Sequence, residues 1–154
     1  MARLDLPSES FDLIWSEGAL YSIGIGSAMR ICRGLLRSGG RLAFTDAVWR
    51  VEDPPQEIKD SFDLDYPAMG MANDVEARIA NVGLELLGRF TPPDEAWWAD
   101  FYTPMGHRIA ELRNSYADDA EVMTILDQLS REPELHRRYS HCYAYEFFVV
   151  RKST

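Results

Sequence analysis

Two carboxylates stand directly after apolar runs of strand length, at positions where proton-transfer chemistry can be placed. Glu17 follows an apolar run at 11–15, and Asp46 follows a second run at 42–45. Ligands of open α/β sheets bind outside the carboxyl ends of the strands. We therefore predict that Glu17 and Asp46 converge in a shared crevice, where either carboxylate can act as a general base. The other candidates for this role are Asp65 and Tyr66.

The segment between the two carboxylates predicts a strand, a crossover helix and a second strand. Apolar residues recur there at helical spacing, and arginines occupy the opposite side. Ser38-Gly39-Gly40 predicts the end of the helix, because only glycine takes a positive φ without a steric penalty. The result is a βαβ unit with parallel strands. The apolar helix positions are Ala28, Ile31, Cys32, Leu35 and Leu36, and the arginines are Arg30, Arg33 and Arg37.

The rest of the chain predicts helices and strands that cover this unit. We see no internal repeat, low-complexity tract or linker, and therefore expect a single domain over residues 1–154. The predicted elements are a helix at 56–62, a helix capped by Asn73 and ending at Gly83, a strand at 84–90, a helix through Ile109, a helix capped by Asp118, a last short helix after Pro133 and an aromatic strand at 140–151.

Composition narrows the classes of partner. The formal net charge is −9, from 25 acidic residues against 16 lysines and arginines, and no long basic run is present. This distribution argues against a nucleic-acid partner. No apolar run reaches the length of a membrane span, and we expect no signal peptide. Cys32 and Cys142 do not form a disulfide framework, so we expect reduced core cysteines in a cytoplasmic protein.

A glycine pair, the histidines and an aromatic cluster could each indicate a ligand site, but the sequence does not favour this interpretation for any of them. Gly24-Ile25-Gly26 superficially matches a dinucleotide fingerprint, but it does not directly follow the strand, and Met29 holds the third glycine position. The histidines lack zinc-ligand spacing, so we expect no metal site. The aromatic cluster at 97–102 is more typical of a core or interface than of a ligand cage, and a lid over a ligand is its alternative role.

Two motifs resemble a known family. FDLIWSEGALY and LLRSGGRLAFTDAVW are similar to the fourth strand, following helix and fifth strand of class I S-adenosylmethionine-dependent methyltransferases, with Ser38 in place of the usual proline. The resemblance implies an α/β fold: a partial Rossmann-like methyltransferase sheet with parallel fourth and fifth strands, an antiparallel last strand and covering helices. The glycine-rich cofactor loop of that family is absent before Phe11. We therefore expect the C-terminal half of a methyltransferase, a truncated relative.

The resemblance also implies roles for individual residues. It implies a small-molecule methyl acceptor and transfer by in-line displacement, with the nucleophile held in position by the protein. The alternative is that residues 16–19 form a simple turn and that Asp46 is a solvated strand end. The implied roles are catalysis by Glu17 and Asp46, contact with S-adenosylmethionine by Ser16, Glu17, Gly18 and Ala19, and contact with the acceptor by Tyr21, Trp49 and Tyr66.

The absent loop sets expectations for the isolated chain. Most of the usual cofactor contacts have no donor here, so we expect weak binding of S-adenosylmethionine and no activity without a further N-terminal half. A non-catalytic, self-associating remnant or interaction module is the alternative function. The strand at 11–15 would be central in a complete sheet, and here one of its edges has no partner. We therefore predict a homodimer or higher oligomer that uses this edge.

Overall fold

The computed structural model describes residues 5–153, so the first four residues and the last residue of the predicted domain lie outside the described part. The chain forms two compact units. Of the described residues, the sheet unit contains 5–91 and 142–153, and the helical unit contains Pro92–His141. Whether the chain acts as one domain is not tested by this grouping and stays a prediction.

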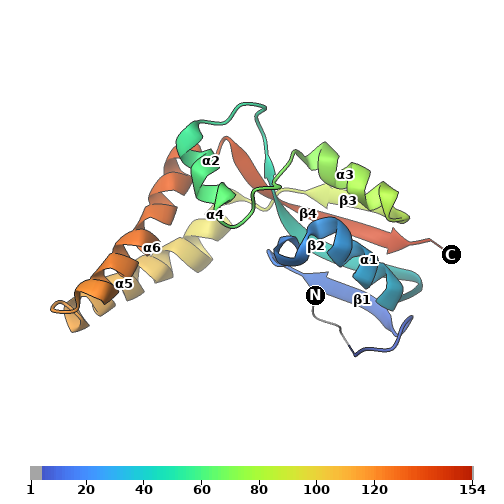
Figure 1. The fold of residues 1–154 in the computed structure, drawn as a ribbon, viewed down its shortest axis with the longest axis horizontal. Coiled ribbons are helices and arrows are strands. Elements are labelled where there is room, and N and C mark those ends of the chain that lie inside the picture. Colours follow the sequence, from blue (N-terminus) through green and yellow to red (C-terminus); the bar gives the residue numbers. More distant parts are fainter. Residues whose placement is uncertain (1–4, 154) are drawn as a thin grey trace. The chain divides into compact units, whose positions relative to one another are not determined.

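The sheet unit is built on four strands, whose order across the sheet is β1-β2-β4-β3 (Figure 1). Strands β1 (Phe11–Ser16) and β2 (Leu36–Trp49) are parallel. Strand β4 (Tyr143–Lys152) lies antiparallel between β2 and β3 (Leu84–Phe90). The parallel pair and the antiparallel last strand beside the second of them confirm the predicted fold class.

Three α-helices and one short helix complete the sheet unit. These are η1 (Leu20–Ile23), α1 (Ile25–Leu35), α2 (Gln56–Asp63) and α3 (Ala72–Asn81). The helical unit consists of α4 (Asp94–Trp97), the π-helical turn η2 (Trp98–Tyr102), α5 (Thr103–Ser115) and α6 (Ala120–Tyr139).

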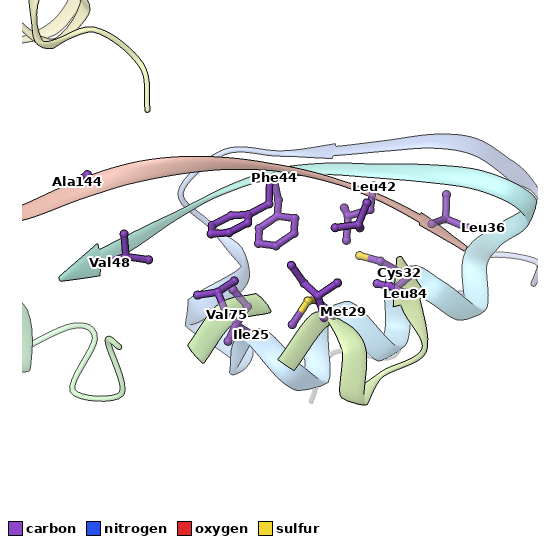
Figure 2. Close-up of a cluster of buried hydrophobic side chains, with 13 residues drawn as sticks. Ile25, Met29, Cys32, Leu36, Leu42, Phe44, Val48, Val75, Leu84 and Ala144 are labelled. Carbon is purple, nitrogen blue, oxygen red and sulfur yellow. The ribbon is translucent and has the colours of Figure 1, made fainter. Parts of the chain in front are cut away.

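The hydrophobic core of the sheet unit lies on one face of the sheet, between the strands and helices α1 and α3 (Figure 2). At its centre Phe44 and Phe148 stack, with ring centroids 5.2 Å apart and both side chains fully buried. Met29 of α1 and Val75 of α3 pack against the same cluster. Helical spacing places Met29 and the buried Cys32 on one stripe, so the predicted amphipathic helix is confirmed.

Strand β2 is much longer than the predicted strand at 42–45. It begins directly after α1 and runs for 14 residues to Trp49. Beyond Asp46, its residues Ala47–Trp49 continue to pair with Tyr143–Tyr145 of β4. Leu36, predicted on the helix face, belongs to the strand instead. The prediction that Asp46 ends the strand is therefore wrong, because pairing with a partner distant in sequence extends the strand past it.

The glycine pair within β2 has a different role from the predicted helix stop. Gly39 has a positive φ of 74°, and the helix has already ended at Leu35. A Cβ on Gly40 would lie 2.9 Å from the carbonyl oxygen of Arg37 and 3.1 Å from that of Phe11. The pairing of β1 with β2 shifts register between Phe11 and Leu13. The glycines thus permit the close backbone approach at this irregularity.

Both predicted helix caps are displaced by one or two positions in the structure. Helix α3 begins at Ala72, and the carboxylate of Asp74 accepts a 2.8 Å hydrogen bond from the backbone N–H of Met71, so Asn73 is not the cap. At the start of α6, Asp119 rather than Asp118 accepts from two backbone N–H groups, each at 3.1 Å. A run of several capping residues indicates a helix start but does not fix the cap.

Helix α6 continues through Pro133, where a separate short helix was predicted. Contacts on both sides of the proline hold the two segments in line. Before it, Arg113 of α5 contacts Asp127 at 2.6 Å. After it, His136 contacts Asp94 at 2.8 Å. Tertiary contacts therefore outweigh the hydrogen bond that the proline cannot donate.

No helix within residues 5–153 is long and apolar enough to cross a membrane. The described residues also contain no group of three or more histidine, cysteine or acidic side chains arranged to hold a metal ion. The cytoplasmic location and the expected absence of a metal and of a nucleic-acid partner stay predictions.

Candidate functional site

The side chain of Asp46 is buried, with an exposed fraction of 1%. Its Oδ2 accepts a 2.9 Å hydrogen bond from the hydroxyl of Tyr66, while its Oδ1 has no hydrogen-bond partner. Burial raises the pKa of Asp46 to about 6, although the Tyr66 hydrogen bond and the nearby charge of Arg78 act in the opposite direction. Asp46 is therefore not the solvated strand end of the alternative interpretation.

Tyr66 connects this carboxylate to a second aromatic ring. It follows α2, and its ring stacks on that of Tyr21 in η1, with centroids 4.9 Å apart. Burial, and then the charge of Asp46, raise the pKa of Tyr66 well above its ordinary value. The hydroxyl therefore stays a proton donor at neutral pH, and it holds one oxygen of the carboxylate in a fixed position.

A second buried acid, Glu146, lies directly opposite Asp46 in the β2–β4 pairing. Directly opposed residues of an antiparallel pair share a face of the sheet. The carboxylate of Glu146 accepts a 2.5 Å hydrogen bond from Thr91, and its other oxygen lies 3.6 Å from a guanidinium nitrogen of Arg89. Arg89 also contacts Glu76 of α3 at 2.8 Å. Glu146 is thus satisfied by its own partners, whereas Asp46 keeps one oxygen available.

The loop after β1 holds the predicted cofactor residues. Gly18 has a φ of 55°, which favours glycine, and its N–H donates a 2.8 Å hydrogen bond to Oγ1 of Thr45. Ser16 is half-buried, whereas Glu17 and Ala19 are exposed. The carboxylate of Glu17 accepts a 2.5 Å hydrogen bond from the indole N–H of Trp15. The loop is therefore tied to β2 through its glycine, while its acid stays accessible.

The structure brings some predicted site residues together and leaves others apart. Asp46, Tyr66 and Tyr21 form a connected group. Trp49 lies three positions beyond Asp46 in the same strand, so the alternation of a strand places it on the opposite face. There its ring contacts Phe62 of α2, with centroids 5.4 Å apart.

Glu17 and Asp46 lie at the same end of the parallel pair, since Ser16 pairs with Phe44. Their side chains have different surroundings. Glu17 contacts Trp15, which packs 5.2 Å from Phe147 on the face away from the core, whereas Asp46 lies on the core face. A crevice shared by the two carboxylates stays a prediction.

Sequence reasoning missed three residues around this group: Arg78, Thr45 and Glu146. Glu146 could have been found, because a lone acid inside the apolar strand YAYEFFVV indicates a buried and partnered charge. Arg78 gave no signal because it reaches Asp46 from α3, and Thr45, next to Asp46 in β2, gave none because its partner is the distant N–H of Gly18.

The aromatic cluster of the helical unit surrounds a buried histidine. The rings of Trp97 and Trp98 each lie 6.0 Å from that of His136, and the ring of Tyr102 lies 5.1 Å from it. Tyr102 and His136 are both buried. Trp97 and Trp98 are half-buried and Phe101 is 44% exposed, so the role of the cluster as core, interface or lid stays a prediction.

No family model and no curated protein matches the sequence. Solved structures do match the fold. A methyltransferase from Geobacter sulfurreducens, crystallised with S-adenosyl-L-homocysteine, aligns with a TM-score of 0.76 at 14% identity, over 94% of this chain and 59% of that one. A putative sarcosine dimethylglycine methyltransferase from Galdieria sulphuraria aligns with a TM-score of 0.73 at 19% identity, over 98% of this chain and 56% of that one.

A [4+2]-cyclase is a third match, with a TM-score of 0.71 at 18% identity, over 99% of this chain and 53% of that one. The chain thus spans a little more than half the length of these three proteins. At such low sequence identity the matches show a similar fold and not a similar activity. The cyclase among them illustrates that one fold carries several activities. The chain has the fold of class I S-adenosylmethionine-dependent methyltransferases, as its motifs predicted.

Proposed function

We propose that this chain forms the acceptor side of a site for S-adenosylmethionine-dependent methyl transfer. The observation that carries the proposal is the buried carboxylate of Asp46, with one oxygen held by Tyr66 and the other without a partner. An unsatisfied buried acceptor at the carboxyl end of a parallel strand pair is unusual outside functional sites. Similar structures that were crystallised with S-adenosyl-L-homocysteine support the choice of cofactor.

The loop after β1 offers one wall for that cofactor. Its exposed carboxylate, on Glu17, is complementary in charge to the ammonium group of the methionine part, and Ser16 and Ala19 flank it. The N–H of Gly18 already donates to Thr45 and shapes the loop. These few contacts form one wall only, so we expect them by themselves to give weak binding.

When bound, S-adenosylmethionine supplies an electrophilic methyl group, which an acceptor takes by in-line displacement. The protein's contribution is orientation, worth several kcal/mol when the nucleophile is held at near-attack distance. Tyr21 and Tyr66 are the aromatic side chains beside this carboxylate that we assign to the acceptor, whereas Trp49, on the opposite face of β2, has no place in this site. Oδ1 of Asp46 accepts the proton from an acceptor that must lose one, and a pKa of about 6 leaves this carboxylate ionised at neutral pH.

The burial of Asp46 requires a movement before an acceptor can reach it. The side chain is only 1% exposed, and Tyr66 covers it from the segment between α2 and α3. We infer that Tyr66 moves aside when the acceptor enters. The Tyr66→Phe variant tests this role, because it keeps the ring that stacks on Tyr21 and removes the hydrogen bond to the carboxylate.

Nuclear magnetic resonance of the ¹⁵N-labelled chain tests the cofactor part of the proposal. Addition of millimolar S-adenosyl-L-homocysteine should shift the amide signals of residues 16–19, and free methionine should shift the same signals more weakly. Adenosine alone should leave them unchanged. Unshifted signals for residues 16–19 at millimolar S-adenosyl-L-homocysteine would refute the proposal, and saturation at low micromolar concentration would refute the expected weakness of binding.

The second candidate function is a non-catalytic module that associates with itself. Exposed aromatic side chains on both edge strands favour it: Trp15 of β1 is 59% exposed and Phe90 of β3 is 56% exposed. Such side chains on a sheet face mark a contact surface. If the chain is such a module, it should self-associate, and S-adenosyl-L-homocysteine should change neither the association nor the amide signals. The methyl-transfer proposal instead predicts the amide shifts described above.

A further inference from the structure

Two buried acids face each other on the core face of the sheet. Asp46 of β2 and Glu146 of β4 are directly opposed in the antiparallel pairing, and both side chains are buried. Directly opposed residues of such a pair have Cβ atoms about 4.5–5.5 Å apart, and like charges at this separation repel each other. Buried charges of this kind require compensation by positive charge or by protons.

The neighbouring side chains supply less positive charge than the acids require. Glu146 contacts Arg89, which also contacts Glu76 of α3. The charge of Arg78, also in α3, acts on Asp46. These contacts connect three carboxylates and only two guanidinium groups, so one negative charge is left over when all five side chains are ionised.

The oxygen that lacks a partner belongs to Asp46. Its Oδ2 accepts the hydrogen bond from Tyr66, whereas Oδ1 is the one buried side-chain polar atom within residues 5–153 that has no hydrogen-bond partner. A buried acceptor costs free energy until a donor reaches it. A donor that also carries a positive charge would satisfy this oxygen and balance the charge of the group.

Aromatic rings adjoin the same carboxylate. The ring of Tyr66, whose hydroxyl holds Asp46, stacks on that of Tyr21. Tyrosine rings attract cations over their faces, and the attraction is stronger in a desolvated site. An ammonium group beside Asp46 would therefore have a carboxylate as its acceptor and aromatic rings as neighbours. A carboxylate or phosphate group would instead add to the excess of negative charge.

We propose that the methyl acceptor is an amine, which binds as its ammonium ion and donates an N–H to Oδ1 of Asp46, and that the opposed charge of Glu146 sets this preference for a cation. The role of the amine as methyl acceptor rests on the proposed function. A neutral alcohol can also donate to Oδ1, but it leaves the negative charge unbalanced. We therefore expect amines to bind more tightly than alcohols, and alcohols more tightly than carboxylates.

The transfer of protons and electrons balances for this acceptor. The ammonium ion gives one proton to Oδ1 of Asp46, and a lone pair remains on its nitrogen. This lone pair forms the bond to the methyl carbon while the bond between that carbon and the sulfur of S-adenosylmethionine breaks. The products are the methylated ammonium ion and neutral S-adenosylhomocysteine, and Asp46 releases its proton to the solvent.

Binding of three small probes of similar size to the ¹⁵N-labelled chain tests the acceptor class. The probes are propylamine, propan-1-ol and propionate at pH 7.5, and the amide signals of Asp46, Ala47 and Tyr66 report on the site. We expect a dissociation constant of about 1–10 mM for propylamine, about tenfold weaker binding of propan-1-ol and no shifts with propionate. Equal affinities for propylamine and propan-1-ol, shifts with propionate, or no shifts with any probe would overturn the proposal.

Two variants test which carboxylates carry the preference for a cation. Asp46→Asn keeps an acceptor for Tyr66 and removes the charge, so it should weaken propylamine binding about tenfold or more. Glu146→Gln should weaken it about threefold, because this acid acts through its charge and not by contact. Neither variant should weaken the binding of propan-1-ol, so the ratio of the two dissociation constants separates a loss of charge from a loss of structure.

Asp63→Asn is the matched control, because Asp63 is an exposed acid at the end of α2. It should leave both dissociation constants unchanged, and circular dichroism should show that all three variants fold. An equal effect of Asp63→Asn and Asp46→Asn, or a parallel loss of propylamine and propan-1-ol binding in Asp46→Asn, would refute a specific ammonium site.

The probes and the cofactor experiment have separate outcomes. Shifts of residues 16–19 with S-adenosyl-L-homocysteine, together with equal binding of propylamine and propan-1-ol, would retain methyl transfer and exclude the amine as its acceptor. Binding of propylamine that depends on Asp46, without shifts of residues 16–19, would overturn methyl transfer and with it the role of the amine as methyl acceptor. Shifts in both experiments, with the expected order of the probes, would support both proposals.

Discussion

The two faces of the sheet carry similar aromatic side chains in different surroundings. On the core face, Phe44 and Phe148 stack and are fully buried beneath α1 and α3. On the opposite face, which we call the open face, Phe147 stacks on Phe90, and Trp15 packs on the ring of Phe147. Phe90 and Trp15 nevertheless keep more than half of their surface exposed. Adjacent residues of one strand, Phe147 and Phe148, thus serve two different surfaces.

This difference shows that strand geometry sets the face on which a side chain lies, whereas the neighbouring elements determine whether that face is buried. Strand geometry sends successive side chains to opposite faces, so the aromatic residues of β4 must divide between the faces. Whether a face stabilises the fold depends on the elements that cover it. The core face, which α1 and α3 cover, therefore contributes more to folding stability than the open face.

Truncation of one aromatic residue on each face gives the largest expected contrast. Phe44→Ala should lower the free energy of unfolding by about 3–5 kcal/mol, because it leaves a cavity among fully buried neighbours. Phe90→Ala should lower it by about 1 kcal/mol, because the ring is half exposed and loses mainly its contact with Phe147. Urea denaturation of the monomer measures both values, and similar losses would contradict the proposed division of roles.

The pH dependence of stability should reveal Asp46, the one residue within 5–153 whose side chain has a buried polar atom without a hydrogen-bond partner. The pKa of Asp46 rises from 3.8 to about 6 on folding, so the folded state binds its proton more tightly than the unfolded chain does. Its stabilising contribution is complete below about pH 4 and is lost as the pH rises through about 6. At about 1.4 kcal/mol for each unit of pKa, the loss is about 3 kcal/mol.

Asp46→Asn should remove this dependence and keep the hydrogen bond from Tyr66, since an amide oxygen also accepts it. The variant should therefore gain stability over the natural chain at pH 8 and show no gain at pH 4. Urea denaturation at the two pH values makes the comparison. If the natural chain and the variant lose the same amount of stability between pH 4 and pH 8, the pKa of Asp46 is not raised.

The same substitution of glycine by alanine should change the free energy of unfolding in opposite directions at two positions. Gly18→Ala should destabilise the sheet unit by about 1–2 kcal/mol, because φ at this position is 55° and alanine is strained there. Gly34→Ala, inside α1 with no atom within 4 Å of the added Cβ, should stabilise it by about 0.5–1 kcal/mol. Thermal unfolding monitored by circular dichroism distinguishes the signs. A neutral Gly18→Ala would indicate a loop that does not hold its backbone geometry.

The smallest effect is expected at the rim of the open face. Arg151 of β4 contacts the carboxylate of Glu85 in β3 through two nitrogens, at 3.1 Å and 2.7 Å, but both side chains are nearly half exposed. Glu85→Ala should therefore lower the unfolding free energy by less than about 1 kcal/mol, and 1 M salt should remove the difference. A loss as large as that of Phe44→Ala would mean that the rim, and not the core, holds β3 in place.

Local signals in the sequence predicted the elements whose ends are determined locally. The strand at 84–90 is confirmed at both ends, because a glycine precedes it and two prolines follow shortly after it. Helix α2 is confirmed to within one residue. The extent of β2 could not be predicted, because its last residues form a strand only by pairing with β4, about one hundred positions later.

The candidate site shows the same limit. Asp46 and Tyr66 were each singled out by type and position, but their hydrogen bond was not predicted, because it depends on how the segment after α2 folds back. The burial of Asp46 was missed for the same reason. Its strand was expected to end there, and an end would have been solvated. Chemistry-bearing residue types are visible in a sequence, whereas their partners depend on packing.

The arrangement of β3 and β4 has a consequence for variation in chain length. The two strands pair like the arms of a hairpin, and the connection between them is the whole helical unit, Pro92–His141. Both ends of this connection are anchored beside the sheet, by Thr91 on Glu146 and by the carbonyl of Cys142 on the N–H of Arg50. Shortening such a connection tenfold changes its closure entropy by only about 2 kcal/mol. Insertions and deletions can therefore accumulate between the two strands without changing their register.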